Sequence, residues 1–370
     1  MQDQAEALAK SGVNVSVVGA IPISFKCIFK NRFLKFGAFE YEKNGVKVRL
    51  FLYPSIPKLK FLNQLVRAKI NKRLLTNHNN EQKIDAIHVH NSTAANAALF
   101  MKQKFDIPYV VTEHSTAYAR GLVSQKEVKS YEPVYQNASY RIAVSKEFCK
   151  MLQDIFQLEF NYVPNVVNTE YFVPIKKEKE QLFKFINIGY LDTKKNQILL
   201  IKAFAKAFSG NENIKLSILG GGPEHQNLQK EITNLNMQEQ IKLFGFAKRE
   251  KVLEELQNSD AFVLSSKYET FGVVVIEAMS CGLPVIATKC GGPESIVESE
   301  YLGVLIENDN LEGLLNAMQT MYKNREIYSV ENIREYVVDN FSQQAIAEKI
   351  LKIYKSIKNK EVLKFRQLEK

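Results

Sequence analysis

One stretch of the chain carries its clearest structural pattern: Asp260-Ala-Phe-Val-Leu-Ser-Ser-Lys-Tyr-Glu-Thr-Phe-Gly-Val-Val-Val-Ile-Glu-Ala-Met-Ser-Cys-Gly-Leu-Pro284. It begins with a short apolar run, 260–264, that is typical of a buried strand. Val273 to Ser280 has the length of a helix and meets a stop signal in Cys281-Gly-Leu-Pro284. A second apolar run, Val285 to Thr288, follows. The order strand, loop, helix, strand predicts one unit of a parallel sheet.

Two glutamates, Glu269 and Glu277, stand in this unit with seven residues between them. Glu269 falls in the predicted loop, and Glu277 falls in the predicted helix. Glu277 is the only charged residue between Glu269 and Lys289, and an ionised carboxylate among apolar side chains is costly unless it has a partner. The start of a helix offers free N–H groups to a phosphate or a sugar hydroxyl, and a carboxylate can accept two hydrogen bonds from a diol. A ligand site is one interpretation; a loop charge and a solvated helix charge are the alternative.

Strand-like and helix-like runs alternate along the rest of the chain. In the first half the predicted strands are 13–19, 46–53, 86–90, 108–112 and 141–144, and the predicted helices are 58–77, 92–104, 124–138 and 145–156. In the second half the predicted strands are 185–189, 214–219, 241–244, 261–264 and 285–287. This alternation predicts an α/β protein with two Rossmann-like parallel sheets, whose ligands bind beyond the carboxyl ends of the strands, in a cleft between domains.

Length, composition and charge limit the classes of protein. A chain of 370 residues can hold two domains with full cores, and no run approaches the ~18 apolar residues of a membrane span. The polar start Met1-Gln-Asp-Gln-Ala-Glu is unlike a signal peptide, so we expect a cytoplasmic protein. Residues 24–83 hold 14 basic and 3 acidic residues with aromatic residues between them. This stripe favours an anionic membrane surface; a nucleic acid or a merely solvated loop is the alternative.

The glutamate pair and its surroundings resemble a known family. The E-x7-E pattern, the following A-M-S-C-G-L-P-V-I-A-T and Gly291-Gly-Pro-Glu-Ser-Ile-Val297 resemble the donor-site signature of the retaining GT-B glycosyltransferases of family 4. Three further segments resemble the same family: Val163-Pro-Asn-Val-Val-Asn168, Ile188-Gly-Tyr-Leu-Asp-Thr-Lys-Lys195 and Leu219-Gly-Gly-Gly-Pro223. The resemblance is strong over about residues 85–350. It implies a GT-B fold with an acceptor-side domain 1–165, a linker 166–182, a donor domain 183–340 and a C-terminal helix 341–370 that packs back on the first domain.

The resemblance also implies roles for individual residues. Glu277 would accept the ribose diol, Glu269 would lie near the transferred sugar, Lys195 would bind phosphate, and His114 would be the cleft histidine on the acceptor side. Further donor contacts would come from the backbone N–H groups of Phe271, Gly272 and Val273 and from Tyr190, Gly221 and Phe246. Tyr190 stands where the family usually has an arginine, which predicts weaker diphosphate binding or a cation from elsewhere. His88 and His90 alternate on a predicted strand, and we interpret them as packing or supporting residues.

The same resemblance implies a retaining transfer of sugar from a UDP- or GDP-sugar to a lipid-linked glycan or surface-polysaccharide precursor at the inner face of the membrane. No Asp-x-Asp occurs in the chain, so we expect neither metal nor cofactor, and we expect no nucleic acid as partner. A GT-B protein that binds nucleotide without transfer is the alternative. A nicotinamide oxidoreductase is disfavoured, because no strand is followed by G-x-G-x-x-G with an acidic residue about 20 positions on.

The start of the chain departs from the family pattern. Family members begin with a strand and a glycine-rich loop before the helix that resembles Gln4 to Lys10 here. The resemblance therefore predicts a missing first strand in the first domain and a functional product that extends upstream of Met1.

Overall fold

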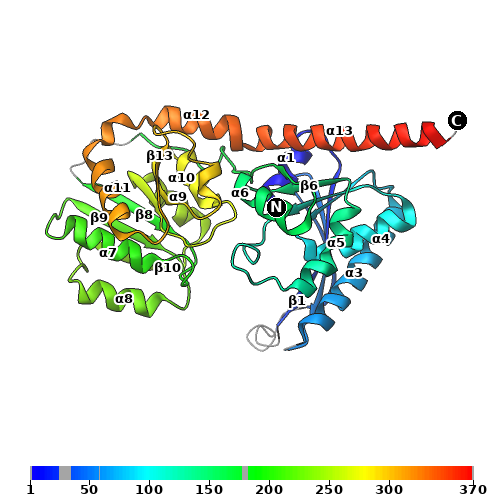
Figure 1. The fold of residues 1–370 in the computed structure, drawn as a ribbon, viewed down its shortest axis with the longest axis horizontal. Coiled ribbons are helices and arrows are strands. Elements are labelled where there is room, and N and C mark those ends of the chain that lie inside the picture. The colour runs from blue at the N-terminus through cyan, green and yellow to red at the C-terminus, as the bar shows by residue number, and fades with distance from the viewer. Residues whose placement is uncertain (1, 25–34, 58, 177–181, 369–370) are drawn as a thin grey trace.

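The computed structural model describes residues 2–24, 35–57, 59–176 and 182–368, and it shows two α/β lobes side by side (Figure 1). The first lobe is built mainly from the first half of the chain and the second from the second half. A long helix pair near the C-terminus runs along one side of both lobes. The basic and aromatic residues 25–34, which lie within the predicted membrane-binding stripe, are outside the described residues.

The second lobe is a doubly wound parallel sheet. Its elements are β8 Phe183–Ile188, α7 Gln197–Phe208, β9 Ile214–Leu219, α8 His225–Asn234, β10 Ile241–Gly245, α9 Arg249–Gln257, β11 Ala261–Leu264, α10 Val273–Ser280, β12 Val285–Thr288, β13 Gly303–Ile306 and α11 Leu311–Lys323. The six strands are parallel in the order β10-β9-β8-β11-β12-β13. The order reverses between β8 and β11, and such a switch point opens a crevice at the carboxyl ends of the strands. The predicted helix 273–280 is present with those bounds.

The first lobe holds two sheets where the sequence predicts one. Its elements are α1 Gln2–Lys10, β1 Val15–Ile23, β2 Gly37–Lys43, β3 Val46–Pro54, α3 Lys60–Glu81, β4 Ile87–His90, α4 Asn96–Phe105, β5 Tyr109–Glu113, α5 Gln125–Gln136, β6 Tyr140–Ala143, α6 Lys146–Phe156 and β7 Asn161–Tyr162. The order β4-β5-β6-β7 forms one parallel sheet, and the order β1-β3-β2 forms another. No ladder joins β1 to β4 among the described residues.

The expectation of a purely parallel first sheet is also wrong at β2. This strand pairs antiparallel with β3, and the turn between them is Asn44-Gly45, with φ of 49° and 75°. Two successive residues with positive φ make a type I′ turn, which matches the twist of a hairpin and favours Asn-Gly. The dipeptide is visible in the sequence, so the hairpin was predictable from a local signal.

The last two helices, α12 Val330–Phe341 and α13 Gln343–Leu368, join the lobes. One face of α13 is apolar and packs on α1 and on the sheet of β5 and β6 (Figure 1). The members of this core are Ala7, Leu8, Val110, Ile142, Val163, Val166, Ile346, Ala347, Ile350, Ile353 and Ile357. The final helix therefore completes the hydrophobic core of the first lobe.

One stretch before and within α3 leaves large apolar side chains exposed. Ile56, Leu59, Leu62 and Leu65 are each at least 36% exposed, within the basic segment 24–83. In the described part of the chain, no helix combines the length and the apolar character needed to cross a membrane.

Candidate functional site

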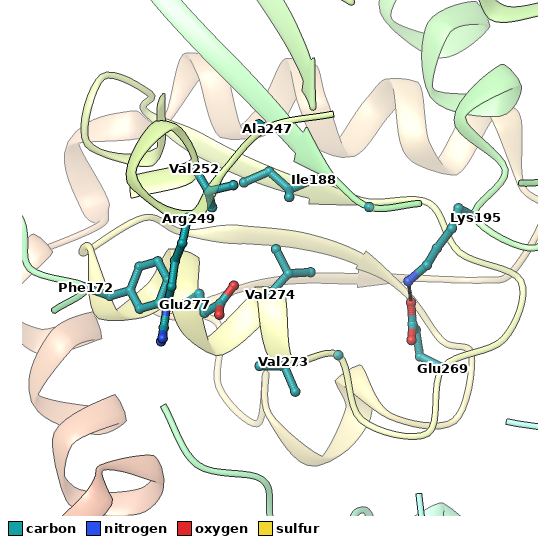
Figure 2. Close-up of a pocket in the computed structure, with 12 residues that line it drawn as sticks. Phe172, Ile188, Lys195, Ala247, Arg249, Val252, Glu269, Val273, Val274 and Glu277 are labelled. Carbon is teal, nitrogen blue, oxygen red and sulfur yellow. Dashed lines mark hydrogen bonds and ion pairs between the residues drawn. The ribbon is translucent and has the colours of Figure 1, made fainter. Parts of the chain in front are cut away.

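A cavity of about 460 Å³ opens at the switch point of the second lobe (Figure 2). This volume is in the range of small-molecule sites. Its lining comes from the ends of β8 and β10, from the start of α9, from the loop after β11 and from α10. The lining residues are Phe172, Ile188, Gly189, Lys195, Ala247, Arg249, Val252, Glu269, Gly272, Val273, Val274 and Glu277. The fold thus brings Lys195 and both glutamates of the E-x7-E pattern to one cavity.

The carboxyl group of Glu277 points into this cavity from α10 and forms no hydrogen bond with another described residue. Burial raises the pKa of its carboxyl to about 7; the Arg249 guanidinium opposes this rise, and the Asp3 carboxylate adds to it. A buried polar group without a partner costs free energy unless a ligand satisfies it. The carboxyl of Glu277 is therefore placed to accept hydrogen bonds from a bound molecule.

Lys195 and Glu269 form an ion pair at the other end of the cavity (Figure 2). Lys195 follows β8, and Glu269 lies in the loop after β11, so the switch point brings the two side chains together. The Ser266 hydroxyl also donates to the Glu269 carboxylate, at 3.0 Å. This end of the cavity therefore carries one cation and one carboxylate that already have partners.

The N-terminus of α10 opens between these two ends. Gly272 caps the helix with a φ of 98°, a left-handed conformation that glycine adopts at little cost. Gly272, Val273 and Val274 all line the cavity. The first N–H groups of a helix have no intrahelical acceptor and lie at the positive end of its dipole, so this edge suits an anion.

His114 lies just after β5 in the first lobe, at the contact with the loop of Glu269. The Thr270 hydroxyl donates to the His114 carbonyl at 2.9 Å, across the two lobes. Nδ1 of His90 and Nε2 of His114 are 2.9 Å apart and share a hydrogen bond. Burial lowers the pKa of His114 to about 4 and that of His90 well below its ordinary value, so both rings are neutral at pH 7.

His88 stacks on His90 and is hydrogen-bonded to the hydroxyls of Tyr354 and Thr112, both at 2.7 Å. The structure therefore places His88 and His90 behind His114, as supporting residues. In the described part of the chain, no group of three or more His, Cys, Asp or Glu side chains has an arrangement that could hold a metal ion.

Four of the predicted donor contacts lie outside the cavity lining. Tyr190 is 59% exposed and Phe246 is 83% exposed. Gly221 lies against Phe246, whose Cβ would be 3.4 Å from a side chain added at Gly221. The Phe271 ring is buried in the core against Phe341. None of these four residues is basic, so none of them supplies the positive charge that the family's arginine would bring to the cavity.

Sequence reasoning missed one residue that lines the cavity, Arg249, and one that holds the backbone at His114, Glu113. Arg249 is the first residue of α9 and lines the cavity beside Glu277. Glu113, at the end of β5, is fully buried and accepts hydrogen bonds from the Ser92 N–H, the His114 N–H and the Tyr135 hydroxyl, at 2.9, 3.0 and 2.7 Å. Glu113 stands at the carboxyl end of its strand, where parallel sheets place ligand sites, and this signal could have identified it; no comparable local signal marks Arg249.

Comparison with family models gives two matches that lie end to end. Residues 1–171 match the model described as Glycosyltransferase Family 4, and residues 169–336 match the model described as Glycosyl transferases group 1.

Individual relatives and a solved structure agree with these matches. The chain is 35% identical over 194 residues to an uncharacterized glycosyltransferase, MJ1059, of Methanocaldococcus jannaschii, and the match covers 49% of this chain and 47% of that protein. It is 26% identical to the Escherichia coli UDP-Gal:alpha-D-GlcNAc-diphosphoundecaprenol alpha-1,3-galactosyltransferase, over 83% of this chain and 84% of that protein. Anabaena HepE, solved with UDP and glucose, superposes with a TM-score of 0.71 at 20% identity and covers 96% of this chain and 94% of that one.

Proposed function

Because the chain belongs to the group 1 and family 4 glycosyltransferases, with their two-domain GT-B fold, we propose that it transfers a sugar from a nucleotide-sugar donor to a lipid-linked or polysaccharide acceptor. The donor binds in the cavity of the second lobe. The acceptor approaches from the first lobe, past His114.

The observation that carries this proposal is Glu277. Its side chain is half-buried, its carboxyl has no hydrogen-bond partner among the described residues, and it lies one helical turn from the start of α10, which suits an anion. A ribose diol supplies two hydroxyl donors to such a carboxylate, while the adjoining diphosphate reaches the N–H groups of Gly272, Val273 and Val274. A nucleoside diphosphate satisfies both ends of this arrangement at once.

Charge on the leaving diphosphate is balanced by protein groups in this proposal. Lys195 can exchange its ion pair with Glu269 for the diphosphate, and the dipole of α10 adds to the same field. Glu269, once released, accepts hydrogen bonds from the transferred sugar. No metal ion is needed for these steps, so activity should persist in EDTA, and its loss there would contradict this part of the proposal.

The transfer retains the anomeric configuration in this proposal. The bond between the anomeric carbon and the diphosphate oxygen breaks as the acceptor oxygen bonds to the same face of that carbon. The acceptor proton passes to the departing diphosphate oxygen. Double displacement would also retain the configuration, but it would require a carboxylate that attacks the anomeric carbon, whereas this proposal gives Glu269 only hydrogen bonds to the sugar. The anomeric configuration of the product, measured by NMR, tests retention.

Two observations support a lipid-linked acceptor at an anionic membrane surface. The similar Escherichia coli protein is named for a diphosphoundecaprenol acceptor. In this chain, the exposed residues Ile56, Leu59, Leu62 and Leu65 lie in a segment rich in Lys and Arg. Apolar side chains among basic ones bind the interface of anionic bilayers. We propose that this surface is the inner face of the membrane.

The deciding experiment has two stages. Thermal unfolding is first measured with UDP, GDP and their sugars; a donor at 100 times its dissociation constant should add about 2.7 kcal/mol of stability. The donor that binds is then incubated with polyprenyl-diphosphate-linked sugars, and the product is identified by mass spectrometry. Stabilisation without product over a broad acceptor panel would favour a binding protein over an enzyme, and no stabilisation by any nucleotide would refute the donor site.

A further inference from the structure

Arg249 occupies the end of the cavity that is farthest from Lys195 (Figure 2). Its guanidinium carbon lies 4.9 Å from the centre of the Tyr171 ring and 5.2 Å from that of Phe172. One of its nitrogen atoms is 3.5 Å from a carboxylate oxygen of Asp3, in the first lobe. The two rings are nearly perpendicular to each other, at 83°, so together they hold the guanidinium in place by cation–π contacts at one end of the cavity lining.

The helix α10 orders the groups along the cavity. Its N-terminus suits the diphosphate, and Glu277 lies four residues further, about 6 Å along the axis. If Glu277 binds the ribose, the base extends further in the same direction, away from Lys195. The cavity wall there consists of Phe172, Ala247 and Val252, which are apolar, and of Arg249.

We propose that Arg249 reads the base of the donor nucleotide and selects bases that present keto oxygens, uracil or guanine, over those that present an amino group at the same position. This inference rests on the proposed function, because it assumes that Glu277 holds the ribose.

The chemistry of the guanidinium sets this preference. An arginine side chain only donates hydrogen bonds, and it cannot lose its proton in a protein. The O4 of uracil and the O6 of guanine accept such bonds, whereas the amino groups of cytosine and adenine can only donate. A cytosine or adenine in the same pose therefore leaves two sets of donors facing each other without acceptors. Such a mismatch discriminates to the extent that the bound nucleotide excludes water from the unpaired donors.

The test compares two pairs of nucleotides that are matched in size: UDP with CDP, and GDP with ADP. Calorimetry should show that the wild-type protein binds the keto member of at least one pair on the order of 10- to 100-fold more tightly. Arg249→Ala should reduce that ratio to about one. Arg249→Gln keeps a polar side chain whose amide can either donate or accept, and it should also abolish the ratio.

The matched control is Lys248→Ala. Lys248 is the exposed basic neighbour of Arg249 and does not line the cavity, so its loss should leave the ratio unchanged. The proposal is overturned if the wild type shows no preference in either pair, if it prefers the amino base, or if Arg249→Ala weakens all four nucleotides equally, since an equal loss indicates a phosphate contact. Failure of the donor site itself looks different: the wild type then binds none of the four nucleotides.

Discussion

Replacing Glu277 by glutamine tests the donor site most directly, because it keeps the shape of the side chain and removes its charge. Hydrogen bonds to a charged group contribute roughly 1.5–3 kcal/mol, so the variant should bind a nucleotide sugar roughly 10- to 150-fold more weakly. The pKa of about 7 adds a second signature. If donor hydroxyls bind the ionised form, wild-type affinity should fall about tenfold between pH 8 and pH 6, because about nine-tenths of the carboxyl groups are protonated at pH 6.

Calorimetry with UDP-glucose or GDP-mannose at pH 6, 7 and 8 measures both effects. A nucleotide sugar is preferable to a nucleoside diphosphate, because it lacks the terminal phosphate whose second ionisation falls at about pH 6. At pH 6, buffers of different ionisation enthalpy should reveal release of nearly one proton on binding by the wild type and none by Glu277→Gln. Equal affinities of the two proteins, or a wild-type affinity independent of pH, would refute the role of Glu277.

The free protein provides an independent check on Glu277. Its folded pKa of about 7 exceeds the ordinary 4.5, so its contribution to stability is complete below pH 4.5 and is lost as the pH rises through 7. Glu277→Gln removes this loss, and the variant without ligand should gain melting temperature relative to the wild type between pH 5 and pH 8. A constant difference across this range would contradict the raised pKa.

Three further substitutions test other parts of the site. Lys195→Ala should remove diphosphate discrimination, so that uridine and UDP bind nearly alike in calorimetry; an unchanged ratio would exclude a phosphate contact. His90→Ala should lower kcat several-fold with little change in the donor KM, because it removes the hydrogen bond that holds the His114 ring. An increase in the donor KM at unchanged kcat, measured by steady-state kinetics, would contradict a supporting role for His90. Leu62→Ser combined with Leu65→Ser should reduce sedimentation with vesicles of anionic phospholipid, whereas Leu122→Ser, which is 59% exposed outside the basic segment, should not; equal losses would argue against a specific membrane surface.

The sequence predicts those features that depend on local patterns. The alternation of apolar and polar residues indicates the strands of the second lobe and the helix of Glu277, because each element needs one buried face. Lys195 and Glu269 each follow the carboxyl end of a parallel strand, and these two strands are neighbours in the sheet. Their side chains therefore meet at the edge of the sheet where ligands bind. The Asn44-Gly45 hairpin was missed although its signal is local.

Other features depend on contacts between distant segments. Arg249 looks like an ordinary helix-start residue in the sequence, and only the approach of Tyr171 and Phe172 reveals that it lines the cavity. Tyr190 shows the opposite case, because it occupies a motif position and yet points to solvent. Chain position places a residue near the end of a strand, but the packing of neighbouring loops decides whether its side chain enters the cavity.

The position of α13 in the fold has a consequence for how the protein is made. Ile346, Ile350 and Ile353 cover Val110 and Ile142, which precede them by about 200 residues. At about 5–20 residues per second, a ribosome needs roughly 10–40 s to synthesise the chain between these two sets of residues. During that time the first lobe exposes an apolar surface to solvent, and chaperones can shield such a surface. Nascent chains of this protein should therefore aggregate most readily when translation stalls shortly before residue 343.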